Sequence, residues 1–408
     1  MPQTLTARAA DGRPAAAPPY AEPSRPDRRT VRSRARHDGP RAALGVVAAV
    51  QGVSAAVHLT VLALMTAASG TTLGQRLVAW DGQLYLSIAA DGYPDSFHHT
   101  PDGALTGNNL AFFPLYPLLV RALHAVTPLS TDLAGLVTAQ LALSAALYAL
   151  YVLLGSLYGR RTALCAVVLV AGVQPMALCF FMAYSEALFL ALAAWTLLAL
   201  RRGAWLSAGV LALCAGLTRP AAVAVVAAVA CAAGQRLWRA RRWEARPVAA
   251  VLLGCLGTPA YLLWVGLRLG RPDAWFVIQE AGWGTHWDSG AAFLRFLLDA
   301  FAHQDGWVPV SSAVLLCAVI VATGLAWRRG EWPPLLVYGT ALVVLTVAQS
   351  NFYHSKLRLL IPAVVFLLPP ARALARARPV TAGTVLAAGT LFGSWYGAHM
   401  LTVWPYAI

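Results

Sequence analysis

The sequence predicts an all-α polytopic membrane protein. This prediction depends on its hydrophobicity and on its long apolar runs. Of its 408 residues, 59% are hydrophobic and only 12% are charged. Ordinary globular domains contain about 45–50% apolar and about 25% charged residues. Several runs approach the roughly 20 residues that a helix needs to cross a bilayer. They are continuous and rich in Ala and Leu, which favours helices over the alternating strands of a membrane barrel.

Eleven apolar segments are expected to form membrane helices. They are residues 43–66, 132–156, 162–182, 184–200, 204–218, 220–234, 248–268, 309–327, 333–350, 357–371 and 380–401. The segments 204–218 and 220–234 are short for full crossings, so tilted, re-entrant and mistaken assignments all stay open for them. Residues 1–42 contain nine arginines, four acids and no apolar run. We expect a disordered basic cytoplasmic tail at 1–42 and a transmembrane domain at 43–408.

The net charge of +14 is divided among small arginine clusters between the apolar segments. If the tail is cytoplasmic, every second connection should be basic. Those connections contain at least two arginines each, at 160–161, 201–202, 236–246, 328–329 and 372–378. The pattern predicts a multi-pass cell-membrane protein with a cytoplasmic N-terminus, with membrane lipids and not nucleic acid as its partners. Six cysteines lie within apolar runs and form no C-x-x-C pair, which argues against a metal centre or a disulfide framework.

The opposite connections are predicted to lie outside the cytoplasm, and they hold most of the acids. They are residues 67–131, 183, 219, 269–308 and 351–356. The external loop 67–131 is the expected catalytic loop, and 269–308 is a second external loop. Within 110–127, Pro114 and Pro117 should break a regular helix, so we expect a segment lying along the outer leaflet. The second loop is rich in Trp, acids and amides, which suits either sugar binding or an interfacial belt.

Residues 80–117 concentrate carboxylates in a chain that has few of them. Asp81, Asp91, Asp95 and Asp102 lie among aromatics, glycines and prolines. Asp81 is the candidate general base, because transfer of a sugar to a hydroxyl needs a carboxylate that accepts the hydroxyl proton. A solvated loop acid, or an N-cap for a helix through 83–90, fits Asp81 as well.

Asp91 and Asp95 are candidates for the substrate site. Together with His98 and His99 they could bind a divalent cation, although Asp91 to Pro94 also reads as a turn. No compact Asp-x-Asp pair is present. We therefore predict no metal ligands and no required cofactor, and leave a divalent cation open.

Two further charged residues interrupt apolar sequence on the predicted outer side. Glu186 follows Tyr184 and Ser185 directly between two apolar segments, and an ionisable residue there is either functional or an acid at a helix N-terminus. Arg219 interrupts the apolar stretch 204–234. It needs a partner, which could be a lipid phosphate or a carboxylate such as Glu186 or Asp81.

The run 354–358 is cationic at the start of an apolar segment on the outer side. It contains His354, Lys356 and Arg358. This departs from the charge pattern of the other outer connections, so a separate purpose is expected. The basic residues could hold a donor phosphate and stabilise the charge of the leaving group. The alternative is that they extend to lipid headgroups.

The sequence resembles the PIG-V family, the mannosyltransferases that add the second mannose to glycosylphosphatidylinositol, together with bacterial relatives. The similarity lies in Trp80-Asp81-Gly82 with Tyr85, in Ile88-Ala89 and Gly92-Tyr93, and in 111–117, which read Ala-Phe-Phe-Pro-Leu-Tyr-Pro. It continues at Tyr184-Ser185-Glu186, at Thr218-Arg219 and at Lys356-Leu357-Arg358. Pro220 and Ala221 depart from the Ser-Asn-Gly that eukaryotic members tend to carry after Thr-Arg. The abundance of Arg and Ala indicates a bacterial source with a high G+C content.

The resemblance implies a GT-C glycosyltransferase fold with about eleven transmembrane helices and a polyprenyl-phosphate-mannose donor. The expected reaction transfers mannose to a lipid-linked or exported glycan acceptor on the extracytoplasmic face. Asp81 matches the catalytic acid. The residues expected to bind substrate are Trp80, Tyr85, Asp91, Asp95, Glu186, Arg219, His354, Lys356 and Arg358. Two alternatives remain, namely a flippase or transporter for a lipid-linked sugar, and an enzyme that uses another polyprenyl-phosphate sugar.

Overall fold

The structure is a computed structural model that describes residues 39–303 and 306–408, and these described residues belong to one compact unit. The predicted tail lies outside the described residues up to position 38. Helices dominate the described part, and its strands are only two residues long. The all-α prediction is therefore confirmed.

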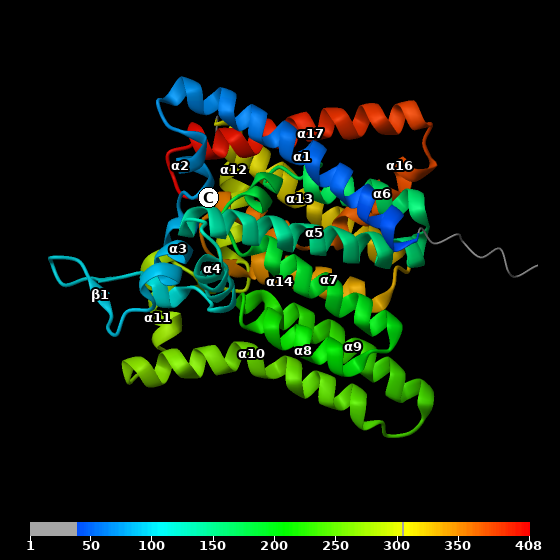
Figure 1. Cartoon of the computed structure of the whole chain (residues 1–408), viewed down its shortest axis with the longest axis horizontal. Coiled ribbons are helices and arrows are strands. Elements are labelled where there is room, and N and C mark those ends of the chain that lie inside the picture. The colour runs from blue at the N-terminus through cyan, green and yellow to red at the C-terminus, as the bar shows by residue number, and fades with distance from the viewer. Residues whose placement is uncertain (1–38, 304–305) are drawn as a thin grey trace, which may run out of the picture. The chain divides into compact units, whose positions relative to one another are not determined.

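The described chain contains helices of very different length (Figure 1). The longest are α1 (Pro40–Ser69), α5 (Thr131–Tyr158), α10 (Ala245–Leu269), α13 (Trp307–Arg328) and α17 (Pro379–Thr402). Helices of intermediate length are α3 (Asp81–Asp91), α4 (Leu115–Val126), α7 (Glu186–Arg202), α8 (Trp205–Gly216), α9 (Val223–Ala240), α11 (Ala274–Trp283), α12 (Ala291–Ala302) and α14 (Pro333–Ala348). The shortest are α2 (Leu73–Leu77), α6 (Arg160–Val168), α15 (Lys356–Leu360) and α16 (Leu368–Arg376).

Short turns and strands complete the chain. The 3-10 turns are η1 (Asn109–Ala111), η3 (Ala177–Phe181), η4 (Pro220–Ala222), η5 (Tyr353–Ser355) and η6 (Val364–Leu367), and η2 (Leu169–Val173) is a π turn. Strands β1 (His98–His99) and β2 (Leu105–Thr106) form one antiparallel hairpin. Strand β3 (His286–Trp287) pairs antiparallel with β4 (Gln349–Ser350), which joins the second loop to the residues just before η5.

Five helical stretches of the described residues are long and apolar enough to cross a membrane. They are Pro40–Ala67, Thr131–Tyr158, Pro220–Ala240, Ala245–Leu269 and Trp307–Arg328. A sixth results if Tyr353–Leu360 and Val364–Arg376, which are bent by 76° at their junction, are counted as one broken span. The polytopic membrane class is therefore supported, and the predicted number of about eleven membrane helices is not confirmed.

Two predicted segments are broken where the sequence contains proline. The segment 162–182 forms α6, then η2 and η3, with Pro175 between the two turns. The segment 357–371 is interrupted at 361–363, where Pro362 cannot donate a backbone hydrogen bond. In contrast, the prediction that Pro114 and Pro117 prevent a helix was wrong. Pro114 is the N-cap of α4 and Pro117 lies in its first turn, where proline is tolerated.

Small residues allow the helices to approach closely. Helices α8 and α10 pack along each other, and a Cβ atom on Gly257 would lie 2.1 Å from the Leu213 carbonyl oxygen. Small residues at such crossings are typical of membrane helices, where dispersion and not water exclusion holds the helices together. On another face of α10, four leucines are between 55% and 75% exposed. They are Leu252, Leu256, Leu263 and Leu267. Their helical spacing gives one apolar face, which suits contact with lipid acyl chains.

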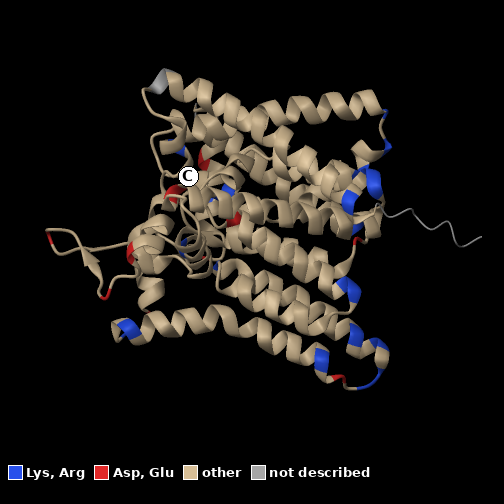
Figure 2. Ribbon diagram, in the orientation of Figure 1, with Lys and Arg blue, Asp and Glu red and all other residues tan. Residues whose placement is uncertain are grey.

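The charged residues are unevenly distributed (Figure 2). Lys and Arg gather at the ends of the helices on the right of the view, where α6, α7, α9 and α16 have their basic residues. The acids of the loops lie mainly at the opposite end. A small group of both signs lies between the helices, and this group is the candidate functional site.

Candidate functional site

Helix α3 carries Asp81 as its first residue. The N-cap is Trp80, whose backbone has φ 59° and ψ −123°, a conformation that bulky residues rarely adopt. Asp81 is therefore not the cap residue, and its side chain is 15% exposed. The indole Nε1 of Trp80 is buried and has no hydrogen-bond partner among the described residues. A rarely adopted backbone conformation next to a largely buried carboxylate is typical of functional sites.

The start of α3 is held against the segment that precedes α7. The Ala183 N–H donates to the Leu77 carbonyl at 3.0 Å, and the Tyr184 hydroxyl donates to the Ala79 carbonyl at 3.2 Å. A Cβ atom on Gly82 would lie 3.3 Å from Cε1 of Tyr184. The glycine of Trp-Asp-Gly thus permits the close approach of α3 to the segment that precedes Glu186.

Arg358 of α15 reaches Asp81 from the far end of the sequence. Its Nη1 donates to Asp81 Oδ2 at 2.5 Å, and its Nε lies 3.7 Å from Glu186 Oε1. The guanidinium carbon also lies 5.2 Å from the centre of the Tyr184 ring. The Arg358 side chain is only 9% exposed. One arginine therefore faces two carboxylates and an aromatic ring in a largely desolvated position.

Arg219 completes the group of charges. Its Nη1 lies 2.6 Å from Glu186 Oε1 and donates to Ser185 Oγ at 3.2 Å. Ser185 Oγ is also 2.7 Å from the Tyr85 hydroxyl of α3. The side chain of Glu186 is 1% exposed. Of the two partners considered for Arg219, the structure contains the carboxylate.

The two acids and two arginines form what we call the charge cluster, comprising Asp81, Glu186, Arg219 and Arg358. Its formal charges balance, which is the condition under which buried ions are tolerated. Arginine guanidinium groups bind both phosphate and carboxylate, and an ionised carboxylate can accept a proton. The cluster therefore combines the two chemical capacities that a transfer from a phosphate-linked donor requires.

Lys356 and His354 lie close in sequence to Arg358 but have other surroundings. The Lys356 ammonium donates to the Thr346 and Gln349 carbonyls at 2.9 and 2.8 Å, and to Asn351 Oδ1 at 2.7 Å. All three of its protons are thus accepted by the chain just before η5. His354 is buried among aromatic rings, which are those of Phe352, Tyr353, Trp404 and Tyr406. Phosphate binding by these two residues stays a prediction.

Asp91 and Asp95 lie away from the charge cluster. Asp91 is the exposed last residue of α3, about 15 Å from Asp81 along the helix axis at 1.5 Å per residue. Asp95 is 88% exposed and forms an ion pair with Arg268. Within residues 39–303 and 306–408, no three His, Cys, Asp or Glu side chains are grouped to hold a metal ion. The roles of both acids in substrate binding stay predictions.

The second loop supports the first. Trp275 Nε1 and Gln279 Nε2 of α11 donate to the Ala111 carbonyl at 3.2 and 3.1 Å. The Tyr261 hydroxyl of α10 lies 2.8 Å from the Phe112 carbonyl. Some of the aromatic and amide groups that we considered for sugar binding therefore hold the 110–117 segment in place.

Two residues of the site, and a third that supports the far end of α3, were not among the predicted site residues. Tyr184 faces Arg358, Ser185 joins Arg219 to Tyr85, and Arg121 holds the other end of α3. Arg121 donates to the Ala89 carbonyl at 2.6 Å and to the Ile88 carbonyl at 3.0 Å. The position of Tyr184 and Ser185 directly before Glu186 was the available sequence signal, whereas no local pattern identified Arg121.

No protein-family model matches the sequence, and no curated protein matches it. The PIG-V resemblance therefore stays a prediction.

Several solved structures are similar to the chain. ArnT from Cupriavidus metallidurans in the apo state has a TM-score of 0.49 and 16% identity, over 85% of this chain and 63% of that one. The same protein bound to undecaprenyl phosphate gives 0.49 and 15%, over 84% and 62%. The Archaeoglobus fulgidus oligosaccharyltransferase in complex with Zn and sulfate gives 0.42 and 14%, over 86% and 53%. The chain thus spans less than two thirds of each of these proteins.

Proposed function

We propose that the protein is a membrane glycosyltransferase of the GT-C type that uses a polyprenyl-phosphate sugar donor, with mannose as the sugar. The observation that carries this proposal is the charge cluster, in which Asp81 from the first loop meets Arg358 from the last third of the chain at 2.5 Å. A nearly buried group of two carboxylates and two guanidiniums in an apolar helical protein is costly to maintain. Such a cost is expected where the charges act on a substrate.

In the proposed reaction, a hydroxyl oxygen of the acceptor forms a bond to the anomeric carbon of the donor sugar. The bond between that carbon and the phosphate oxygen breaks, and the electron pair leaves with the polyprenyl phosphate. The proton of the hydroxyl passes to the carboxylate of Asp81. The negative charge on the departing phosphate is stabilised by Arg358 and Arg219, because guanidinium groups bind phosphate oxygens through two parallel hydrogen bonds.

Supporting residues take the remaining roles in this proposal. Glu186 balances the two arginines between turnovers, and Tyr85 and Ser185 fix Arg219 through their hydroxyl groups. Trp80, Asp91 and Asp95 border the route to the acceptor, which is a lipid-linked or exported glycan. The site faces the extracytoplasmic side, as the arginine distribution predicts. Lys356 and His354 order the chain that leads into α15.

The test is transfer of radiolabelled mannose from polyprenyl-phosphate mannose in membranes that contain the full chain. We expect label in a lipid or glycan product with the wild type. Asp81→Asn should lower turnover by at least about 100-fold, the lower range for loss of a positioned general base. Asp102→Asn is the matched control, since Asp102 is an exposed acid of the same loop, in the turn between β1 and β2.

Each outcome has a distinct meaning. Equal turnover for Asp81→Asn and the wild type would remove Asp81 as the base. Transfer with a different polyprenyl-phosphate sugar, and none with mannose, would correct the donor and retain the enzyme class. Movement of the intact lipid across the membrane, with no release of polyprenyl phosphate, would identify a flippase instead.

A further inference from the structure

The turn between α9 and α10 has features that the proposed reaction does not use. We call residues 236–246 the basic turn, which contains five arginines and one glutamate. Two helical stretches that are apolar and long enough to cross a membrane, Pro220–Ala240 and Ala245–Leu269, meet at this turn. The basic turn therefore lies where the chain leaves and re-enters the apolar layer.

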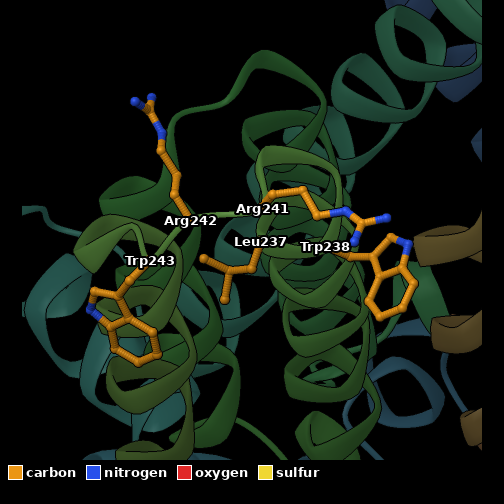
Figure 3. A pocket seen from close by; sticks show the side chains of 5 residues that line it. All are labelled: Leu237, Trp238, Arg241, Arg242 and Trp243. Carbon is orange, nitrogen blue, oxygen red and sulfur yellow. The ribbon is translucent and has the colours of Figure 1, made fainter.

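A shallow groove at the basic turn combines indoles with guanidinium groups (Figure 3). It is lined by Leu237, Trp238, Arg241, Arg242 and Trp243. Trp238 and Trp243 are each 74% exposed, which is unfavourable for such large apolar rings in water. Figure 3 shows Arg241 beside the Trp238 ring, with its guanidinium carbon 5.4 Å from the ring centre, while Arg242 and Trp243 project from the other side.

The backbone of the turn favours a specific purpose for Arg241. Helices α1, α7, α10 and α11 end on a left-handed glycine, as is usual for a C-cap. Helix α9 instead ends on Arg241 at φ 52°. An L-residue with a side chain is strained there, and glycine would remove this strain. The arginine thus occupies a position where its backbone conformation is unfavourable.

The turn carries more positive charge than its own acid can neutralise. Glu244 accepts two hydrogen bonds from Arg236, at 3.1 and 2.9 Å, and lies 3.5 Å from Arg242. Among the described residues, Arg239, Arg241 and Arg246 have no carboxylate partner. An anionic group from outside the chain would therefore find unpaired guanidinium groups beside two exposed indoles.

We propose that the basic turn is a binding site for the headgroup of an anionic phospholipid. Arg241 and Arg242 hold the phosphate, and the rings of Trp238 and Trp243 lie at the level between headgroup and acyl chains, where tryptophan is favoured. This proposal is independent of the proposed glycosyl transfer, because the residue of the charge cluster that is nearest in sequence, Arg219, lies at the opposite end of the Pro220–Ala240 stretch. It accounts for the indoles, the left-handed arginine and the excess charge together.

The test is lipid binding by the full chain after delipidation in a mild detergent, measured by native mass spectrometry during titration. Phosphatidylglycerol is the anionic probe, and phosphatidylcholine is the zwitterionic comparison. We expect wild type to prefer phosphatidylglycerol. The double variant Arg241→Gln/Arg242→Gln should bind it roughly 30-fold more weakly, as the loss of two arginines near an anionic lipid predicts. Thermal unfolding should be almost unchanged, since the turn is exposed.

The matched control is Arg201→Gln/Arg202→Gln, which removes the same charge from the exposed C-terminal end of α7. The site is supported if only the basic-turn variant, Arg241→Gln/Arg242→Gln, loses the preference for phosphatidylglycerol. Equal loss in both variants, or in neither, overturns it. Glycerol phosphate and inorganic phosphate are titrated in parallel. If either binds as tightly as phosphatidylglycerol, the turn is a site for soluble phosphate, and a change of oligomeric state without loss of lipid would instead indicate a second copy.

Discussion

The pairing of Arg358 with two carboxylates leads to a quantitative prediction about stability. In the wild type the charge cluster contains two negative and two positive groups. Arg358→Gln leaves two negative charges and one positive, and it removes the 2.5 Å partner of Asp81. Arg219→Gln also removes one positive charge, but Arg358 still lies 3.7 Å from Glu186. We therefore expect Arg358→Gln to destabilise the protein more than Arg219→Gln.

The magnitude follows from the burial of the pair. Removal of one partner from a buried ion pair costs about 3–5 kcal/mol, and both side chains are nearly hidden, at 9% and 15% exposure. The double variant Asp81→Asn/Arg358→Gln restores the charge balance, with one negative and one positive group remaining. It should thus recover roughly 1–3 kcal/mol relative to the sum of the two single variants.

The assay is unfolding in mixed micelles with increasing denaturing detergent, followed by far-UV circular dichroism. Arg271→Gln is the control, because Arg271 and its partner Asp273 are 51% and 53% exposed, and a surface ion pair contributes little to stability. Strict additivity of Asp81→Asn and Arg358→Gln would refute the reasoning, since it would mean that the two side chains do not interact. A control as destabilising as Arg358→Gln would also refute it.

Three further changes test other parts of the structure. Gly257→Ala places a methyl group 2.1 Å from the Leu213 carbonyl oxygen, so α8 and α10 must separate. The free energy of unfolding should then fall by about 1–3 kcal/mol in the same assay. Gly45→Ala, where a Cβ atom would have nothing within 4 Å, should have little effect. Arg121→Ala removes the hydrogen-bond donor of two carbonyls at the end of α3. Turnover should fall with little change in the KM for the sugar donor, and Arg121→Lys should restore part of the turnover. Unchanged turnover in both variants would exclude a positioning role. The N–H groups of Ala292 and Gly290 hold the pKa of Asp288 below its usual range. The stabilisation by Asp288 is therefore present above about pH 4, the ordinary pKa of Asp, and is lost as the pH falls further. The thermal midpoint of Asp288→Asn should approach that of the wild type only in acid, and a difference that does not depend on pH would contradict this.

The sequence identified the segments that contribute to the charge cluster more reliably than it identified which side chains contact one another there. Trp80-Asp81-Gly82, Tyr184-Ser185-Glu186 and Arg358 were recognised as separate candidates, and the structure brings parts of all three into one site. They could be found because charged residues are rare in this chain and therefore conspicuous wherever an apolar segment ends. Asp91 was grouped with Asp81 from proximity in sequence, but α3 separates the two along its axis.

Local sequence by itself determined the class of this protein, since apolar runs, prolines and arginine clusters act on the nearest residues and on the membrane. It predicted helices and an acid-rich first loop, whereas the breaks at Pro175 and Pro362 lie within segments that were expected to be continuous. Only the tertiary structure decided that Arg358 pairs with Asp81 across 277 positions, that Arg219 pairs with Glu186, and that Lys356 is occupied by backbone carbonyls. The reason is physical, because a long charged side chain has several partners within reach, and the packing of distant helices selects which of them it meets.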